Sequence, residues 1–387
     1  MVDRRGYPSS FYNFGTLERN FFMNGLVIDL KNGNILKLGE HKLVLRAYFG
    51  FKRLTQQEIE NVYGTPPTFE KFDPEEILTN EYYCCLTFFE CYFPLVFAKM
   101  LEYKKSRRDH VDQALINQIV NDAKYAVDAN YEHFDKNIYL PITKFGDYYN
   151  KIIENRDRYL YTHEKMVGAL KELKAKGKVL FLVTDSHYEF TEALMSHGYG
   201  ENWREYFDFI IVHGSKRKFF IPNDQQFRKI NISETNKLGP AVTGLKKYNM
   251  YTEGNYTRLE KNIDHLAQNP RGRILYIGDN YAHDVLTTEN LQGWDAVCIM
   301  EELQKVDVGP DYDERIWGNW KYEETPYGYV PSFWYSEMVK KAEAVVPSVE
   351  CDAMMDFYYE RNALEDQKME HEQRLMHQRD SHIVKSP

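Results

Sequence analysis

Residues 177–187 read GKVLFLVTDSH, and this stretch decides the fold class. VLFLV (179–183) is a continuous apolar run of strand length, which is typical of a parallel strand buried on both faces. Thr184, Asp185 and Ser186 follow it directly, and a helical pattern comes next. The stretch therefore predicts a strand, a polar turn and a helix, which is the repeating unit of an open α/β sheet.

Three further apolar runs repeat this organisation downstream. They are FDFIIV (207–212), RILYIG (273–278) and DAVCIM (295–300), each with helical patterns beside it. Residues 221–253 are polar and punctuated by glycine and proline, which indicates a long hairpin or flap. We therefore predict a Rossmann-like parallel sheet with helices on both faces over residues 161–345.

The N-terminal part, residues 1–160, has a different pattern. GLVIDL (25–30), NILKL (34–38) and KLVLRAYF (42–49) predict a small β-meander, with Asn32-Gly33 as a two-residue hairpin turn. Helices are expected to dominate from about residue 74. In VDQALINQIVNDAKYAV (111–127) apolar residues recur at every fourth position, which predicts one buried helix face. This region is predicted to be largely helical with a small β-meander.

One segment imitates a membrane span. Residues 82–101, YYCCLTFFECYFPLVFAKML, are apolar over about the length of a transmembrane helix. Glu90 and Pro94 interrupt the run and Lys99 lies near its end, and charges at mid-bilayer cost roughly 2.5–3.5 kcal/mol each. We therefore expect a buried or interface helix, which the proline could kink, and no membrane partner.

Composition excludes some classes of function. Lysine and arginine number 49 and aspartate and glutamate 58, so the formal net charge is −9 and we expect no nucleic-acid partner. The five cysteines form no Cys-x-x-Cys motif, which argues against a disulfide framework or a zinc cluster. No apolar run follows the arginines of MVDRRGYPSS, so we expect a cytoplasmic protein. The protein could also associate with copies of itself. The charged segment 346–387 is expected to be either a helix that frays into disorder or a helix that binds a partner.

Ligands of open parallel sheets bind beyond the carboxyl ends of the strands. Thr184 and Ser186 follow the first run, Lys216 follows the second, and Asp279 and Asp284 follow the third. Hydroxyl and ammonium groups can hold phosphoryl oxygens, and two carboxylates can hold Mg²⁺. The sequence therefore predicts a phosphate and magnesium site. The alternatives are that Thr184 or Asp284 caps the next helix and that Lys216 is a surface charge.

In this order the segments resemble the haloacid dehalogenase-type phosphohydrolases. Thr184 corresponds to their second motif, Lys216 to the third, and Asp279 with Asp284 to the fourth. The resemblance extends to the cytosolic 5′-nucleotidase family and is closest to the 5′-nucleotidase domain-containing proteins, over about residues 20–345. It rests on FFMNGLVIDLKNGNILKLGEHKLVLRAYFG, GKVLFLVTDSH, YFDFIIVHGSKRKFF and ILYIGDNYAHDV.

The family's first motif, Asp-x-Asp after an apolar strand, should precede the hairpin at residue 24. MVDRRGYPSSFYNFGTLERNFFM contains no such motif, and Asp29 lies in the hairpin without a second aspartate. DYD at 311–313 follows no apolar strand. We therefore expect a family member that lacks its N-terminus, through an alternative start, an incomplete gene prediction or true loss.

The resemblance implies a Mg²⁺-dependent hydrolysis of nucleoside monophosphates through an aspartyl-phosphate. Thr184 and Lys216 would hold the transferring group, Ser186 would assist, and Asp279 with Asp284 would hold the metal. Phe51 occupies the place of a base-stacking aromatic residue, although core packing is the alternative. Without the nucleophile we expect little or no turnover. The competing readings are a non-catalytic member that binds a phosphate ligand or a protein, and a purely structural scaffold.

The resemblance also implies a gap in the sheet. The first-motif strand of the superfamily lies between the strand that ends at Thr184 and the strand that ends at Asp279. Without it, strands 179–183 and 273–277 are expected to stand too far apart to pair, since adjacent strands lie about 4.8 Å apart. Segments before residue 24, or closure of the two strands, would otherwise have to fill the gap.

Overall fold

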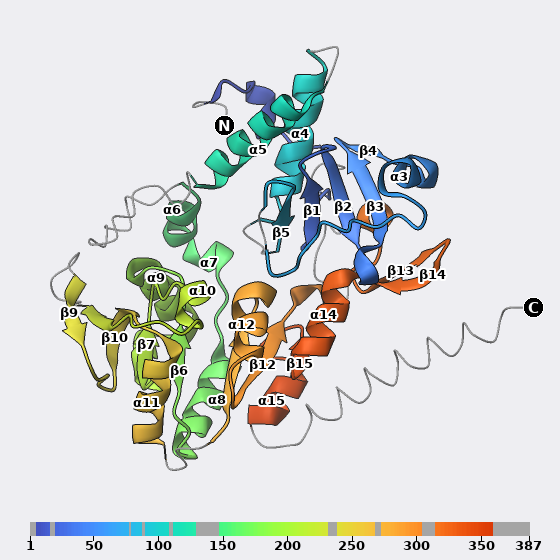
Figure 1. The fold of residues 1–387 in the computed structure, drawn as a ribbon. Helices are drawn as coiled ribbons and strands as arrows, with labels where there is room; N and C mark the ends of the chain where they lie inside the picture. The colour runs from blue at the N-terminus through green and yellow to red at the C-terminus, as the bar shows by residue number, and fades with distance from the viewer. Residues whose placement is uncertain are drawn as a thin grey trace, which may run out of the picture. The chain divides into compact units, whose positions relative to one another are not determined.

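The computed structural model describes residues 5–15, 20–76, 79–86, 90–107, 111–128, 147–230, 238–267, 272–303 and 314–358. The chain divides into two compact units (Figure 1). The first comprises Met1–Ala129, Asp279–Ala282 and Glu302–Lys341, and the second comprises Asn130–Gly278, His283–Glu301 and Ala342–Pro387. Each unit is described by itself.

An antiparallel sheet of order β4-β3-β2-β1-β5 forms the centre of the first unit. Its strands are β1 (Leu26–Asp29), β2 (Asn34–Leu38), β3 (Val44–Phe49), β4 (Lys52–Arg53) and β5 (Tyr82–Cys85). The predicted three-stranded meander is confirmed, and β4 and β5 extend it. Every residue of β1, β2 and β5 is buried, so both faces of this part of the sheet are covered.

The hairpin between β1 and β2 differs from the two-residue turn that the sequence predicted. Asp29 pairs with Asn34, so the loop comprises residues 30–33. The Gly33 N–H donates to the Asp29 carbonyl at 2.8 Å, and Gly33 has φ 71°. The Asp29 carboxylate accepts hydrogen bonds from the backbone N–H groups of Lys31 and Asn32. The Asp29 side chain closes the longer loop, a feature that the Asn-Gly signal alone did not indicate.

The apolar segment 82–101 is not one kinked helix. Its first residues form β5, and α4 (Phe93–Lys105) begins only after an interruption, with Pro94 in its first turn. A proline there breaks no intrahelical hydrogen bond and introduces no kink. In α5 (Gln113–Asp128) the residues Leu115, Ile119 and Ala123 are buried, as the periodicity predicted. Within the described ranges, no helix has both the length and the apolar character that a bilayer crossing requires.

The remaining elements of the first unit tie its sheet to the segment that follows residue 301. An ion-pair cluster joins Lys37 of β2 and Arg46 of β3 to Glu323 of a short hairpin, with Lys37 Nζ 2.8 Å from Glu323 Oε2. Each carboxylate oxygen of Glu323 therefore has a cationic partner.

The other elements of the first unit are α3 (Gln56–Tyr63), α13 (Glu314–Trp317), β13 (Tyr322–Thr325), β14 (Gly328–Pro331) and α14 (Phe333–Lys341).

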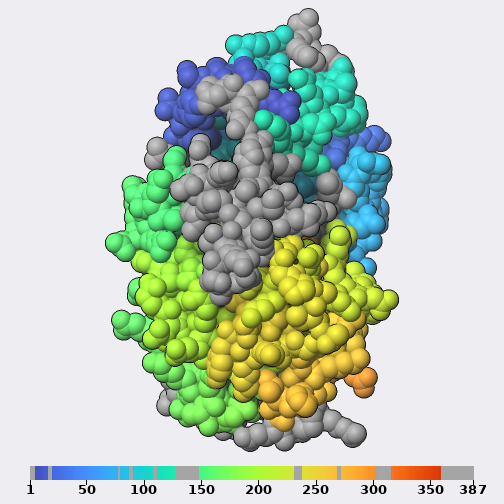
Figure 2. Space-filling view, turned by 90° about the vertical axis from the view of Figure 1, so that its left-hand side faces the viewer, coloured from blue at the N-terminus to red at the C-terminus, as the bar shows by residue number. Residues whose placement is uncertain are grey.

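The second unit contains the predicted α/β core. One sheet has the order β6-β7-β10-β8-β9, in which β6 pairs with β7 and β7 with β10 in parallel, and β8 and β9 are antiparallel. Its strands are β6 (Phe181–Val183), β7 (Phe209–Ile211), β8 (Phe227–Ile230), β9 (Leu238–Val242) and β10 (Asn249–Glu253). The segment predicted as a flap therefore continues the sheet, and its exposed residues lie on the yellow-green surface of Figure 2.

A second, wholly parallel sheet has the order β11-β12-β15. It comprises β11 (Ile274–Gly278), β12 (Trp294–Ile299) and β15 (Ala344–Val346). The fold is therefore α/β with parallel strands, as predicted. The helices of this unit are α6 (Asp147–Glu154), α7 (Arg156–Tyr159), α8 (Glu164–Ala175), α9 (Tyr188–Tyr199), α10 (Lys216–Phe219), α11 (Tyr256–Leu266), α12 (Leu286–Glu289) and α15 (Asp352–Tyr358).

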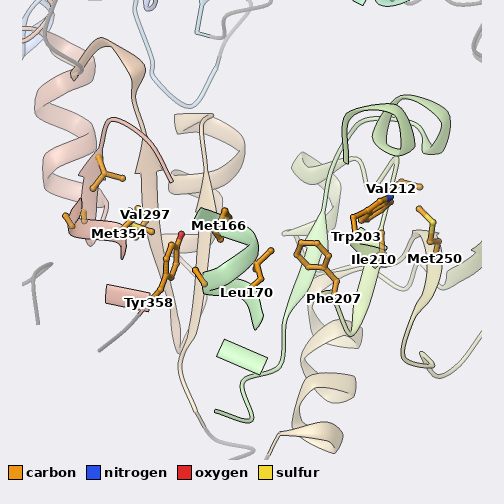
Figure 3. Packing of buried hydrophobic residues seen from close by; sticks show 14 of the residues in the cluster. Met166, Leu170, Trp203, Phe207, Ile210, Val212, Met250, Val297, Met354 and Tyr358 are labelled. Atoms are coloured by element: carbon orange, nitrogen blue, oxygen red, sulfur yellow. The ribbon is translucent and has the colours of Figure 1, made fainter. Parts of the chain in front are cut away.

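Helices cover both faces of these strands. Along β7 and its flanks, Ile210 and Val212 belong to one hydrophobic cluster and Phe209 and Ile211 to another. The first cluster includes Met166 and Leu170 of α8 and Met354 and Tyr358 of α15 (Figure 3). The second includes Leu259 and Ile263 of α11. Asp352–Tyr358, part of the segment expected to be a charged tail, thus contribute to the core, whereas the charged residues beyond Tyr358 lie outside the described residues.

The predicted gap between β6 and β11 is confirmed. Among the described residues, β6 pairs only with β7 and β11 only with β12. The side chains of the two strands nevertheless share layers: Leu182 and Ile277 belong to one cluster, and Phe181 and Ile274 to the other. All four of these side chains are only partly buried.

Candidate active site

The loops that follow β6 and β7 are joined by hydrogen bonds. The Thr184 N–H donates to the Ile211 carbonyl, and the Gly214 N–H donates to the Thr184 carbonyl, each at 2.9 Å. The Thr184 hydroxyl accepts a hydrogen bond from the Ser186 N–H at 3.1 Å, which closes a tight turn. Thr184 does not cap the next helix, because His187 holds the N-cap position of α9. The sequence prediction that these loops lie together is confirmed.

Lys216 lies where the β7 loop ends and α10 begins. His213 and Ser215, which precede it, have left-handed backbone conformations with φ 48° and 53°. The Asp185 carboxylate accepts a hydrogen bond from the Lys216 N–H at 2.7 Å and so fixes the lysine backbone to the β6 loop. Only 16% of the Lys216 side chain is exposed, so it is not the solvated surface charge of the alternative interpretation.

The ammonium of Lys216 forms an ion pair with Asp284. Lys216 Nζ lies 2.8 Å from Asp284 Oδ1, and the Asp284 side chain is 1% exposed. Asp284 lies in the one-turn helix Tyr281–Val285, and Val285 rather than Asp284 is the N-cap of α12. Losing one partner of a buried pair leaves an uncompensated charge, at a cost of about 3–5 kcal/mol. The pair therefore holds the ends of β7 and β11 in a fixed relation.

Gly278, the last residue of β11, makes room for Asp284. A Cβ atom at Gly278 would lie 2.4 Å from Asp284 Cγ and 2.4 Å from Oδ2. The φ of Gly278 is not among the positive values, so a left-handed backbone conformation does not explain this glycine. The glycine is required by the close approach of a carboxylate to the backbone.

Histidines lie near the same loops. The rings of His187 and His213 are stacked, with centroids 4.2 Å apart and planes inclined by 22°. Burial, and then the neighbouring His213, lowers the pKa of His187 to about 3. Burial also lowers the pKa of His283, against the opposing influence of Asp185 and Asp284. Both His187 and His283 are therefore neutral at physiological pH and add no positive charge to the loops.

The other predicted site residues are placed as follows. Ser186 lies in the β6 loop, where its carbonyl accepts a hydrogen bond from the His213 N–H at 2.8 Å. Asp279 follows β11 directly, is exposed, and belongs to the first unit, so its position relative to Thr184 and Lys216 stays a prediction. Phe51, also in the first unit, packs with its ring centroid 5.0 Å from that of Phe21.

The Asp29 carboxylate is occupied by its own loop. It accepts hydrogen bonds from the Asn32 side chain and the Tyr63 hydroxyl at 2.7 Å each, besides the two backbone donors described above. Its side chain is almost wholly buried. Asp29 is therefore placed as a structural residue of the hairpin. The DYD motif at 311–313 lies outside the described residues.

The donor chemistry of the site is compatible with a divalent cation. Mg²⁺ keeps several waters and is commonly bound through one or two carboxylates together with substrate phosphate. Asp284 offers a buried carboxylate whose negative charge already attracts a cation, Lys216. In the part of the chain that the structure describes, no group of three or more His, Cys, Asp or Glu side chains is arranged to hold a metal ion.

Sequence reasoning missed Tyr276, the third residue of β11. It is 5% exposed, its hydroxyl donates to the Val183 carbonyl at 3.4 Å, and Lys216 Nζ lies 5.8 Å from the centroid of its ring. The available signal was a tyrosine inside an otherwise aliphatic strand that ends at the site. Asp185, although noted, was not given its role in fixing the Lys216 backbone.

This chain is similar both to a protein family as a whole and to individual relatives. The sequence model of the 5′ nucleotidase family matches residues 1–307. The human 5′-nucleotidase domain-containing protein 1 is 27% identical over 335 residues, which cover 84% of this chain and 70% of the relative. The bovine protein of the same name is 26% identical over 332 residues, with the same two coverages.

A second group of relatives is more distant. The human 5′-nucleotidase domain-containing protein 2 is 25% identical over 322 residues. The match covers 79% of this chain and 55% of that relative. The resemblance to the 5′-nucleotidase domain-containing proteins, which was inferred from four segments of the sequence, is confirmed by these matches.

Proposed function

The chain belongs to the 5′ nucleotidase family, and from this premise we propose that its strand-end site binds the phosphate group of a nucleoside monophosphate. The family supports a nucleotidase-type function. We further propose which residues hold the ligand, which metal ion is bound and how much turnover these 387 residues support.

The observation that carries the proposal is the ammonium of Lys216, held by a buried carboxylate at the carboxyl ends of parallel strands. An ammonium has three N–H donors, so the bond to Asp284 leaves capacity for a phosphoryl oxygen. The side chain is already ordered before the ligand arrives, which lowers the entropic cost of binding. A lysine on an exposed surface would lack this pre-organisation.

Thr184 and Ser186 are proposed to hold the remaining phosphoryl oxygens. Hydrogen bonds join their loop to the β7 loop, which ends at Lys216, and this neighbourhood supports the proposal. Asp279 and Asp284 would hold Mg²⁺, which when bound neutralises phosphoryl charge. Stacking of a base on Phe51 is retained as a weaker proposal, since its ring packs against Phe21.

In the described part of the chain, no aspartate of the proposed site matches the nucleophile that the family resemblance implies. Asp29, the one alternative considered, has its carboxylate occupied by four hydrogen bonds. Deleting a nucleophile costs on the order of 10⁶ in rate in a well-studied hydrolase. We propose that this chain binds nucleoside monophosphates and hydrolyses them at no more than the background rate.

Equilibrium dialysis of the purified chain with ribonucleoside 5′-monophosphates, with and without Mg²⁺, tests the proposal. Lys216→Gln keeps a donor for Asp284 but removes the charge, and is expected to weaken binding by about tenfold or more, because charge-assisted hydrogen bonds to phosphate are strong. Lys218→Gln, an exposed lysine on the same short helix, is the matched control and should bind as the wild type does.

Two results would contradict the proposal. If the wild-type chain binds none of the nucleotides, the strand-end constellation is structural. If both lysine variants lose binding equally, the interaction is a general attraction to positive charge and not a site. Because Lys216→Gln removes one charge of a buried ion pair and is expected to lower the thermal unfolding midpoint, binding is compared at a temperature at which the wild type and both variants are fully folded.

A further inference from the structure

The loop that follows β6 holds the loop that follows β7 through three hydrogen bonds. In each of them a backbone N–H group of the β7 loop donates to one of three consecutive residues of the β6 loop. The bonds run from His213 to the Ser186 carbonyl at 2.8 Å, from Gly214 to the Thr184 carbonyl at 2.9 Å, and from Lys216 to the Asp185 carboxylate at 2.7 Å. Among these three acceptors Asp185 alone uses its side chain, so a substitution can remove its bond without changing the others.

The segment that these bonds hold has an unfavourable backbone conformation. Ser215 has φ 53° and ψ 60°, in the left-handed region that residues with a Cβ atom rarely adopt. Its neighbours on both sides, Gly214 and Lys216, donate their N–H groups to the β6 loop. The conformation of Ser215 is therefore fixed from both sides, and Asp185 supplies the attachment next to the lysine.

Asp185 also takes over a task that the Ser215 side chain does not perform. The first N–H groups of a helix have no partner within the helix, and in α10 the first of them belongs to Lys216. An N-cap residue normally has an extended backbone, from which its side chain reaches such groups. Ser215 holds the N-cap position of α10 in a left-handed conformation, and its side chain makes no capping hydrogen bond. Asp185 satisfies the Lys216 N–H from another loop instead.

The charge of Asp185 argues against direct contact with a phosphate ligand, because a carboxylate and a phosphoryl group repel each other. Lys216, by contrast, is held at both of its ends. Asp185 accepts from its backbone N–H, and its Nζ lies 2.8 Å from Asp284 Oδ1. Any movement at the backbone end must be absorbed along the lysine side chain, so it alters the position or the mobility of the ammonium.

We propose that Asp185 is a positioning residue. Its carboxylate holds Ser215 in the left-handed conformation, and this conformation sets the direction in which Lys216 presents its ammonium to a phosphoryl oxygen. The inference rests on the proposed phosphate site, and adds a residue that acts through the lysine backbone without touching the ligand. Phosphate binding then requires the hydrogen bond to the Lys216 N–H and not the charge of Asp185.

Two substitutions of Asp185 separate the hydrogen bond from the charge. Asp185→Asn and Asp185→Ala both remove the negative charge, but only asparagine keeps an oxygen that can accept from the Lys216 N–H. A third variant combines Asp185→Ala with Ser215→Gly, because glycine adopts the left-handed conformation without the cost that a Cβ atom brings.

Three quantities are measured. The first is the dissociation constant for inorganic phosphate. The second is the Overhauser contact between the amide and Hα protons of Ser215, which is strong at positive φ. The third is the ¹⁵Nζ–¹H correlation of Lys216, which is visible only when the ammonium is held in slow exchange.

We expect Asp185→Ala to bind phosphate about fivefold more weakly than Asp185→Asn, the effect of one hydrogen bond, and to lose both NMR signals. Asp185→Asn is expected to keep both signals. Adding Ser215→Gly to Asp185→Ala is expected to tighten binding again by at least about twofold. Equal phosphate affinity of Asp185→Ala and Asp185→Asn overturns the proposal, as does a double variant that binds no better than Asp185→Ala.

The two proposals can fail separately. If the wild-type chain binds no phosphate but Asp185→Ala, unlike Asp185→Asn, loses the Ser215 contact and the Lys216 correlation, the proposed function fails and the positioning of the ammonium stands. If Asp185→Ala does not fold, the wild-type chain supplies the answer. A strong Ser215 contact and a slowly exchanging Lys216 amide are expected there, and the absence of either refutes the arrangement.

Discussion

Lys216 and Asp284 form an ion pair that is almost removed from water, and two neighbouring residues support it. Asp185 fixes the lysine backbone, and Gly278 gives the carboxylate room. Sequence order identified both charged residues, because each follows an apolar strand. It could not show that they pair, since pairing depends on how far apart the loops lie in space.

Gly278→Ala tests whether the close approach of Asp284 maintains the pair. The added methyl group would overlap the carboxylate, so Asp284 must move away from Lys216 and the Lys216 ¹⁵Nζ–¹H signal is expected to disappear. Gly244→Ala is the matched control, because its new Cβ atom would meet only Asn262 Oδ1, at 4.0 Å. A Gly278→Ala variant with an unchanged lysine signal would contradict this account of the glycine.

Glu189 gives the second prediction for a single residue. Burial raises the pKa of its carboxyl from 4.5 to about 7, and its Oε2 atom is buried without a hydrogen-bond partner among the described residues. The folded state holds this proton more tightly than the unfolded chain does. The stabilising contribution is therefore complete below pH 4.5 and is lost as the pH rises through 7.

Glu189→Gln should remove that loss. The variant is expected to unfold at a temperature about 2 °C or more above the wild type at pH 8, and at the same temperature at pH 4.5, as differential scanning calorimetry can measure. Glu192→Gln is the control, because Glu192 pairs with Arg204 and should gain nothing at pH 8. An equal difference between Glu189→Gln and the wild type at both pH values would contradict the raised pKa.

At the scale of elements, the strands were the most predictable features and the connections the least. The four apolar runs became β6, β7, β11 and β12, because burial on both faces demands such runs. β10 was missed, since NMYTE is too polar to stand out, yet it pairs in parallel with β7. The β1–β2 loop was also misjudged, because the Asp29 side chain stabilises a longer loop than Asn32-Gly33 alone predicts.

The gap between β6 and β11 has a measurable consequence for backbone amides. Along β6, the Thr184 N–H donates to β7 and the Leu180 carbonyl accepts from the Asp208 N–H, so by alternation Val183 faces the gap. Along β11, the Ile274 N–H donates to the Gly293 carbonyl, so Ile277 faces the gap. The Val183 carbonyl receives the Tyr276 hydroxyl there, which agrees with this orientation.

Hydrogen exchange should therefore separate alternate residues of the same strand. The amides of Val183 and Ile277 are expected to exchange at least about tenfold faster than those of Leu182 and Tyr276, because water rather than a strand satisfies them. Residue-resolved exchange followed by NMR measures this. Equal protection of both sets would mean that a further strand or a closing movement fills the gap.

At the scale of the whole molecule, the class of fold predicted from the sequence is confirmed, whereas the functional assignment of the strand-end residues stays a prediction. Thr184 and Lys216 lie together because consecutive parallel strands bring their carboxyl ends to one edge. Asp279 was assigned by the same argument, but it belongs to the first unit, so its part in metal binding stays a prediction. Such long-range relations depend on packing between segments that no local pattern records.

The central claim is that these 387 residues hold a nucleotide phosphate without cleaving it. A ³¹P NMR spectrum of a nucleoside 5′-monophosphate, recorded with the purified chain and Mg²⁺ over hours, tests both halves at once. The account predicts that the phosphate ester resonance shifts and broadens with protein concentration, and that Lys216→Gln needs about tenfold more protein or more for the same effect. It also predicts that no inorganic phosphate resonance grows above the protein-free rate. Robust growth of the inorganic phosphate resonance, abolished by Asp279→Ala, would contradict the account and show that another residue supplies the nucleophile.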